Sequence, residues 1–293
     1  MPQASSSAAR DRPFKQVDVF TAAAYRGNPL AVVLDGSGLD DEAMQRFARW
    51  TNLSETAFLL PPTQPGADYR VRIFTPGGEL PFAGHPTLGS CHAWLEAGGS
   101  ARRDDLVVQE CQVGLVRIRR GEPRLAFAAP PLKRSSPSPE LLAQVTAALG
   151  IKAQQVIAAQ LLDNGPVWLG LLLDQPQTVL QLKPDHGALK VLGQKVGVAA
   201  RYLAQHAAAP PSPTLEVRAF AAPVGIEEDP VTGSLNASLA QWLIAEGHLQ
   251  PTYVAAQGTC LDRRGRVYID QDASQDVWVG GQSVTCITGK VLL

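Results

Sequence analysis

Two short stretches of this sequence, GHPTLGS at residues 84–90 and EDPVTGS at residues 228–234, indicate its fold. Each follows a strand-like segment and a turn, and each leads into an apolar segment of helical length. With a gap of two residues in the turn, the alignment pairs His85 with Asp229 and sets the two Gly-Ser pairs against each other. Because strand, turn, X-Pro motif, Gly-Ser and helix recur in the same order, we interpret the two halves as an internal duplication.

The two expected helices, residues 88–97 and 235–245, are apolar around most of their circumference. Such a helix must be enclosed by other structure. The surrounding sequence offers short apolar runs of strand length, and it lacks the regular strand–helix alternation and the GxGxxG motif of a Rossmann fold. We therefore expect an α+β fold of two similar lobes, each a highly curved, mostly antiparallel sheet or barrel around a central buried helix. The expected strands are residues 17–20, 30–34, 56–60, 69–74, 106–109, 115–118, 156–161, 167–173, 215–220, 267–269, 277–279 and 284–287.

Composition argues against several classes of function. The 293 residues are 45% apolar and 18% charged, with a net charge of −1, which is typical of a soluble globular protein and gives no general basis for binding nucleic acid. The longest apolar run, residues 167–173, is much shorter than the roughly 20 residues of a membrane span. Four widely spaced cysteines without a CxxC pair favour reduced thiols in the cytoplasm, and the five histidines lack metal-ligand spacing.

The X-Pro motifs lie where the two buried helices are expected to begin. Unpaired backbone N–H groups and the positive end of the helix dipole favour a carboxylate there, and Gly84 and Gly233 allow the backbone to approach a ligand. If both helix starts face one cleft between the lobes, a small anion is held there with His85 and Asp229 on opposite sides. Taken singly, Asp229 is equally well explained as an N-cap or turn residue, and His85 is better explained as a hydrogen-bonded turn histidine.

Glu55 is the third candidate for chemistry. It lies where an expected helix, residues 41–50, gives way to an apolar strand. A partly desolvated carboxylate in that position has a raised pKa, which suits a general base. The alternative is a strand-edge glutamate that pairs with Arg49 or Arg72, and the spacing alone favours this second interpretation.

Several segments, in the same order along the chain, resemble the PhzF-like family from about residue 14 to residue 293. The paired GHPT and DPVTGS motifs are the most specific of them. The resemblance implies the fold of diaminopimelate epimerase, with a cleft between two lobes, and a homodimer. It also implies that the C-terminal strands return to the first lobe. The segments are RGNPLAV at residues 26–32, NLSETAF at 52–58, FTP at 74–76, ELPFAGHPT at 79–87 and EDPVTGS at 228–234.

The resemblance also implies roles for individual residues. The acid/base glutamate of the family falls on Glu55, its catalytic histidine and aspartate fall on His85 and Asp229, and its helix-start serine falls on Ser234. Gly84 and Gly233 match glycines that line the family's site and bind the substrate. The founding activity is the isomerisation of trans-2,3-dihydro-3-hydroxyanthranilate in phenazine biosynthesis, which proceeds by proton transfer without metal or organic cofactor.

The match is incomplete near the end of the chain. The usual Gln-Gly…Gly-Arg-Pro stretch reads QGTCLDRR at residues 257–264, so its second glycine and its proline are replaced by Asp262 and Arg264, and we expect a different turn. The DPV of the second motif is found in many members that are not assigned to phenazine production. The resemblance therefore supports the site better than it supports a particular small carboxylic acid as the substrate.

Two other functions remain open at this point. One is an amino-acid epimerase or racemase on the same fold, which commonly uses one cysteine from each lobe. The X-Pro positions here hold no cysteine, and Cys91 aligns with Leu235 in the repeat, so this mechanism is not favoured. The other is a non-catalytic protein that binds a small molecule in the cleft.

The expected division of the chain follows from the lobes. Residues 1–12 are small, polar and unpatterned, and we expect a flexible tail there. The N-terminal lobe is expected to span residues 13–130 together with 279–293, and the C-terminal lobe residues 131–278.

Overall fold

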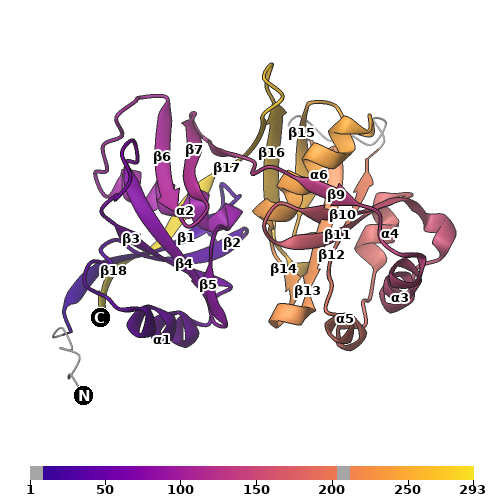
Figure 1. The fold of residues 1–293 in the computed structure, drawn as a ribbon, viewed down its shortest axis with the longest axis horizontal. Coiled ribbons are helices and arrows are strands. Elements are labelled where there is room, and N and C mark those ends of the chain that lie inside the picture. The colour runs from indigo at the N-terminus through magenta and orange to yellow at the C-terminus, as the bar shows by residue number, and fades with distance from the viewer. Residues whose placement is uncertain (1–8, 203–211) are drawn as a thin grey trace.

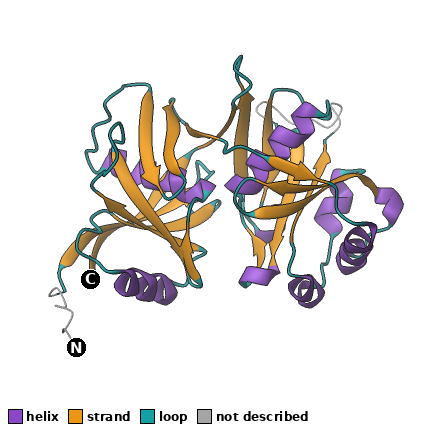
Figure 2. Cartoon of the chain, viewed as in Figure 1, coloured by secondary structure: helices purple, strands orange, loops and turns teal. Residues whose placement is uncertain are grey.

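The computed structural model describes residues 9–202 and 212–293. Within these ranges the chain forms a mixed α+β fold in which 18 strands belong to one hydrogen-bonded network, with a small number of helices against it (Figures 1 and 2). The strands are β1 (Asp11–Val19), β2 (Asn28–Val33), β3 (Glu55–Leu60), β4 (Tyr69–Thr75), β5 (Gly78–Leu80), β6 (Leu106–Cys111), β7 (Gly114–Arg120), β8 (Leu125–Ala128), β9 (Lys133–Ser135), β10 (Val156–Asp163), β11 (Val167–Leu173), β12 (Lys195–Arg201), β13 (Leu215–Ala221), β14 (Ile226–Asp229), β15 (Thr252–Gln257), β16 (Gly265–Gln271), β17 (Val277–Gly281) and β18 (Ser283–Leu292). The helices are α1 (Asp41–Thr51), α2 (Gly84–Glu96), α3 (Pro139–Leu149), α4 (Pro176–Gln181), α5 (His186–Leu192) and α6 (Gly233–Ala245).

Helices α2 and α6 are the two that the apolar pattern predicted to be enclosed, and this prediction is confirmed. Helix α2 packs against β1, β2, β3, β6 and β8, and helix α6 packs against β10, β11, β16 and β17. Leu88 and Cys91 of α2 and Leu235 and Trp242 of α6 are fully buried in one continuous hydrophobic core. The two buried helices therefore give both groups of strands in Figure 1 a shared interior.

The remaining helices cover outer faces of the sheet. Helix α1 packs on β3 and β4 through Met44 and Phe47, and the sequence predicted this helix. Helices α4 and α5, which were not predicted, pack with α3 around Leu169 and Val198 on the outer side of β11 and β12. Because β11 is then buried on both faces, its sequence is a continuous apolar run without strand alternation.

The internal duplication is visible in the strand pairing. In the first half β2 runs parallel to β3, and β3 runs antiparallel to β4, with Thr56 opposite Phe74. In the second half β11 runs parallel to β12, and β12 runs antiparallel to β13, with Val196 opposite Phe220. Strands β4 and β13 each then pair antiparallel with the next short strand and parallel with the one that follows the buried helix.

The residue alignment expected at the two motifs is wrong. Helices α2 and α6 each have 13 residues and begin at Gly84 and Gly233, so Gly84 rather than Gly89 is the counterpart of Gly233. The connection before α6 is longer because it contains a 3-10 turn, Ala222–Val224, followed by the left-handed Gly225. Matching the Gly-Ser letters therefore shifted the register. His85 lies in the first turn of its helix, whereas Asp229 ends a strand that precedes the other helix.

The C-terminal segment connects the two groups of strands. Strand β17 pairs with β16 on one side and with β8 on the other. Strand β18 then runs antiparallel to β1 along its length, so that Ser283 lies opposite Val19 and Leu292 opposite Asp11. No helix of the described ranges has both the length and the apolar character needed to cross a membrane.

The expected tail of residues 1–12 extends too far. Residues 1–8 lie outside the described part of the chain, but β1 already begins at Asp11. Arg12 is 2% exposed, and its guanidinium donates hydrogen bonds to the carbonyl oxygens of Asp35, Ser37 and Leu293. The charged start of the strand carries no apolar alternation, because β18 and a buried arginine, rather than apolar packing, hold it in place.

We expect the Arg12→Ala variant to lose about 2 kcal/mol of unfolding free energy, because the three hydrogen bonds of the buried guanidinium are lost. Urea denaturation at pH 7 measures this loss. The matched control is Arg10→Ala, since Arg10 is exposed and its exposed ion pair with Asp35 contributes at most about 1 kcal/mol. Equal losses in the two variants would contradict a structural role for Arg12.

Candidate active site

A cavity of about 760 Å³ is lined by residues of both halves of the chain. Two parallel strand pairs present their N-terminal ends to it. From the first half, Asn28 begins β2 and Glu55 begins β3. From the second half, Trp168 lies near the start of β11 and Lys195 begins β12. The repeated strand pairing therefore places polar side chains from equivalent positions in the walls of one cavity.

The two buried helices meet at their first residues. A Cβ atom on Gly84 would lie 2.8 Å from the Cα of Gly233, and a Cβ atom on Gly233 would lie 2.8 Å from the Cα of Gly84. Gly84, Gly233 and His85 are not among the residues that line the cavity, whereas Ser234 is. The missing side chains of the two glycines allow the helix starts to touch each other, and their expected contact with a substrate stays a prediction.

Glu55 and His85 face each other in the site. The Glu55 Oε2 atom lies 3.4 Å from His85 Nε2, and their side chains are 13% and 5% exposed. Both atoms are buried, and neither has a hydrogen-bond partner among the described residues. The alternative partners of Glu55 are engaged elsewhere, since Arg72 pairs with Glu79 and Asp41. The interpretation of Glu55 as a strand-edge partner of an arginine is therefore wrong.

Asn28 connects His85 to Asp229. It is fully buried, and its Nδ2 donates hydrogen bonds of 2.9 Å to Asp229 Oδ1 and to the carbonyl oxygen of Val231. The same nitrogen lies 3.3 Å from His85 Nδ1. The other oxygen of Asp229 accepts a hydrogen bond from Thr232 Oγ1. His85 and Asp229 are thus brought together through Asn28, although they occupy different positions in the repeat.

The protonation states of the three groups follow from their burial. Burial raises the pKa of Glu55 to about 6, partly opposed by a hydrogen bond from Ser54 and by the charge of Lys195. Burial also raises the pKa of Asp229 to about 6, and the nearby Glu55 carboxylate adds to this shift. Burial lowers the pKa of His85 to about 4, so the imidazole is neutral near pH 7.

A neutral imidazole has one N–H group. Asn28 Nδ2 already donates its two hydrogens to Asp229 Oδ1 and to the carbonyl oxygen of Val231, so it has no third hydrogen for His85 Nδ1, 3.3 Å away. His85 Nε2 lies 3.4 Å from Glu55 Oε2 without forming a hydrogen bond to it. The arrangement places an ionisable base of raised pKa beside a neutral donor, within a cavity that a small molecule fits, which is suited to moving a proton on carbon.

Ser234 lies at the start of α6, and two side chains hold it. Its Oγ accepts a hydrogen bond of 3.3 Å from Trp168 Nε1, and its carbonyl oxygen accepts one of 2.9 Å from Asn164. The hydroxyl therefore stays in the cavity wall, beside the indole ring.

Three further residues of the site were not identified from the sequence. Asn28 lies in the quoted stretch at residues 26–32, but nothing in that stretch indicated a contact with His85 or Asp229. Trp168 lies in an apolar run that predicted only a buried strand. Lys195 begins β12, a strand that was not predicted, so no signal was available for it.

The turn at residues 257–264 also contributes to the site. Arg263 lines the cavity, and its guanidinium donates to the carbonyl oxygen of Tyr25. Asp262 has φ 55°, a left-handed conformation that glycine adopts freely and that aspartate tolerates. The replacement of the family glycine by Asp262 is therefore compatible with the turn.

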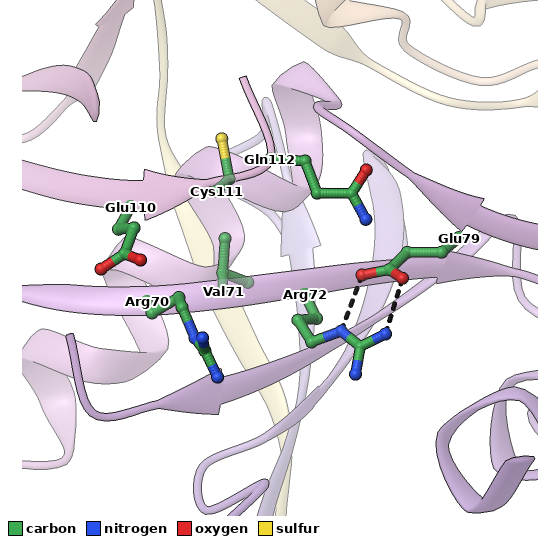
Figure 3. A pocket seen from close by; sticks show the side chains of 7 residues that line it. All are labelled: Arg70, Val71, Arg72, Glu79, Glu110, Cys111 and Gln112. Carbon is green, nitrogen blue, oxygen red and sulfur yellow. Dashed lines mark hydrogen bonds and ion pairs between the residues drawn. The ribbon is translucent and has the colours of Figure 1, made fainter. Parts of the chain in front are cut away.

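A second, smaller cavity of about 320 Å³ opens between β4 and β6 (Figure 3). Its acidic groups already have partners within the chain. Arg72 forms two hydrogen bonds with Glu79, and Glu110 accepts hydrogen bonds from Thr63 and Gln64, which help to lower its pKa against the effect of burial. This cavity is a weaker candidate because its acidic groups are held by resident donors.

The family model of phenazine biosynthesis-like proteins matches residues 17–289. The chain belongs to this PhzF-like family. It is 33% identical to trans-2,3-dihydro-3-hydroxyanthranilate isomerase of Pseudomonas aeruginosa over 94% of this chain and 98% of that protein. It is 37% identical to antisense-enhancing sequence 1 of Schizosaccharomyces pombe over 96% of this chain and 98% of that protein. The crystal structure of a PhzF-family protein of Enterococcus faecalis aligns with a TM-score of 0.78 and 28% identity, covering 97% of this chain and all of that one.

The PhzF-like family includes named isomerases, so the resemblance found in the sequence is confirmed at the level of family and of mixed α+β fold.

Proposed function

We propose that this protein is a cofactor-independent isomerase that moves a proton on a small carboxylic acid, with trans-2,3-dihydro-3-hydroxyanthranilate as the first candidate substrate. The proposal includes the finer description of the fold, two similar lobes with the cavity between them. The observation that carries it is the pair of unpartnered buried atoms, Glu55 Oε2 and His85 Nε2, that face each other in the site. The 33% identity to the Pseudomonas aeruginosa isomerase supports the choice of the first candidate.

Glu55 acts as the base in the proposed reaction. Above pH 6 its carboxylate is ionised and takes a proton from a carbon of the substrate, so that the electrons of the C–H bond move into the conjugated system. The protonated Glu55 then returns this proton to a different carbon, which completes the double-bond shift without any net gain or loss of atoms. His85, neutral at this pH, donates a hydrogen bond from its ring N–H to the substrate or to the Glu55 carboxylate and keeps its proton.

Asp229 and the helix starts orient the substrate in this proposal. Asn28 and Thr232 hold the Asp229 carboxyl group in one orientation. Because the Glu55 carboxylate raises the pKa of Asp229, ionisation of Glu55 makes the Asp229 carboxyl group hold its proton more readily. The start of α6 at Ser234 offers N–H groups and a hydroxyl to the substrate carboxylate.

A two-thiol epimerase is less compatible with the site. None of the four cysteines lines the cavity. Cys91 is buried inside α2, and burial raises the pKa of its thiol to about 12, so it is not a thiolate at physiological pH.

The experiment that tests the proposal is incubation of the protein with trans-2,3-dihydro-3-hydroxyanthranilate in deuterated water, followed by NMR. A migrated double bond supports isomerisation, and protium rather than deuterium at the new C–H position would show that Glu55 returns the same proton. Deuterium at the original carbon with loss of stereochemical purity would instead indicate epimerisation. Binding without any exchange, for this acid and for a panel of related unsaturated acids, would favour a non-catalytic binding protein.

We expect kcat/KM to depend on pH with an apparent pKa near 6, because the base must be ionised and burial raises the pKa of Glu55 to about 6. The rate should fall roughly tenfold for each pH unit below this value. A steady-state profile from pH 4.5 to 8 measures it, with a substrate whose own carboxyl ionises well below this range. A profile that is flat down to pH 5 would contradict the role of Glu55 as a desolvated base.

A further inference from the structure

Lys195 is a cation in the cavity wall, and no acidic side chain of the described residues lies within 4.0 Å of its ammonium group. Of the described lysines, Lys15 and Lys290 form ion pairs within 4.0 Å, and Lys195 forms none. Its Nζ lies 5.8 Å from the centre of the Trp168 ring. Burial lowers the pKa of Lys195 while the more distant Glu55 raises it, so an anion bound beside the ammonium group would stabilise its charged form.

The position of Lys195 in the repeat is the second observation. Thr56 of β3 lies opposite Phe74, and Val196 of β12 lies opposite Phe220, in the matching strands of the two halves. The residue that precedes Thr56 is Glu55, and the residue that precedes Val196 is Lys195. Lys195 therefore occupies in the second half the position that Glu55 occupies in the first. The duplicated fold therefore presents the carboxyl group of Glu55 from one half and the ammonium group of Lys195 from the other half to the same cavity.

Trp168 relates Lys195 to the helix start. The strands β11 and β12 are parallel, with Trp168 directly beside Lys195. The indole Nε1 donates to Ser234 Oγ at the start of α6, and the Lys195 ammonium group lies near the ring centre. Trp168 thus lies next to both anion-attracting groups of this wall, the helix start and the ammonium group.

We propose that Lys195 binds a second anionic group of the substrate, so that the protein acts on small unsaturated acids with two anionic groups, at least one of them a carboxylate. This inference rests on the proposed function, in which the first carboxylate lies at the start of α6. The second group lies over the far end of the Trp168 indole, beside Lys195. Arg263, the other cation that lines the cavity, adds to the positive potential.

The test compares the binding of benzoate with that of the three benzenedicarboxylates, phthalate, isophthalate and terephthalate, by titration calorimetry. The three diacids place the second carboxylate at different separations from the first. We expect at least one diacid to bind the wild-type protein ten times or more tightly than benzoate. The Lys195→Met variant should reduce this preference to less than about threefold and leave the benzoate Kd within twofold. Lys195→Gln, which keeps polarity and most of the length, should behave in the same way if the methionine variant fails to fold.

The matched control is Lys190→Met, which removes an exposed lysine of α5 and should retain the full preference for the diacid. Equal weakening of benzoate and diacids in the Lys195 variants would overturn the proposal, because Lys195 would then serve the first carboxylate or only the ionisation of Glu55. The absence of any diacid preference in the wild-type protein would also overturn it.

Different results would contradict the proposed function and this inference. Binding needs no turnover, so the diacid preference should persist in the Glu55→Gln variant. If no acid is isomerised but the preference depends on Lys195, the proposed reaction is wrong and the second anion site stands. If trans-2,3-dihydro-3-hydroxyanthranilate is isomerised by the wild-type and Lys195→Met proteins alike, and no diacid is preferred, the reaction stands and the second anion site does not.

Discussion

The Glu55→Gln variant should lose at least about 10³-fold in kcat with any acid that the wild-type protein isomerises, because the amide cannot accept a proton from carbon. The change preserves the shape of the side chain beside His85. Single-turnover assays with double-bond migration as the readout measure the loss. A control variant, Glu42→Gln, removes an exposed carboxylate on α1 and should keep wild-type turnover. Activity within tenfold of wild type in Glu55→Gln would remove Glu55 from the mechanism.

The same variant should be more stable than the wild-type protein at high pH. The pKa of Glu55 is raised from 4.5 to about 6 in the folded protein, so the protonated form is the one that folding favours. Its favourable contribution is complete below pH 4.5 and is lost as the pH rises through 6. At pH 8 the wild-type protein therefore carries a cost of about 2 kcal/mol that the glutamine does not. Urea unfolding should give a gain of up to this size at pH 8 and little difference at pH 4.

This stability result separates a catalytic role from a structural one. If Glu55 were needed for folding, glutamine would lower both turnover and stability. A loss of turnover together with a gain in stability is expected only for a carboxylate that is needed for the reaction and whose burial lowers the unfolding free energy.

The fold was predictable where the sequence pattern arises from packing. Residues 235–245 are apolar on all sides because α6 is enclosed by strands, and this pattern is readable without a structure. Strand β12 was missed because Lys195 and three small residues interrupt its apolar character, and it is held by pairing with β11 and β13. Helices such as α4, with six residues, are too short to carry a clear period.

The site was predictable only in part, and for a related reason. Glu55, His85 and Asp229 were selected from motifs, but the expected symmetry of His85 and Asp229 is absent. Their proximity depends on Asn28, whose three contacts join segments far apart in the sequence. Register between strands, which local sequence does not specify, made Lys195 the counterpart of Glu55.

The Gly84→Ala variant should lose about 3 kcal/mol of unfolding free energy and most of its turnover. Its new Cβ would lie 2.8 Å from the Cα of Gly233 and 2.9 Å from the ring of Phe127, so backbone must move. Any separation of the helix starts also displaces His85, the next residue along α2. The matched control is Gly289→Ala on β18, where the added carbon meets nothing within 4 Å and the unfolding free energy should change by less than about 0.5 kcal/mol.

The contact between the helix starts can be isolated by combining Gly84→Ala with Gly233→Ala. Each single change pushes the same two backbones apart, so the second methyl group enters space that the first has already opened. The double variant should therefore lose less stability than the sum of the single losses, by about 1 kcal/mol. Strictly additive losses would mean that the new methyl group of Gly84→Ala destabilises the protein through its contact with Phe127. Other contacts, and not the two glycines, would then set the distance between the helix starts. The loss of turnover should track the coupling between the two glycine changes more closely than it tracks the total loss of stability. The reason is that the position of His85 relative to Glu55 depends on how closely the two helices approach.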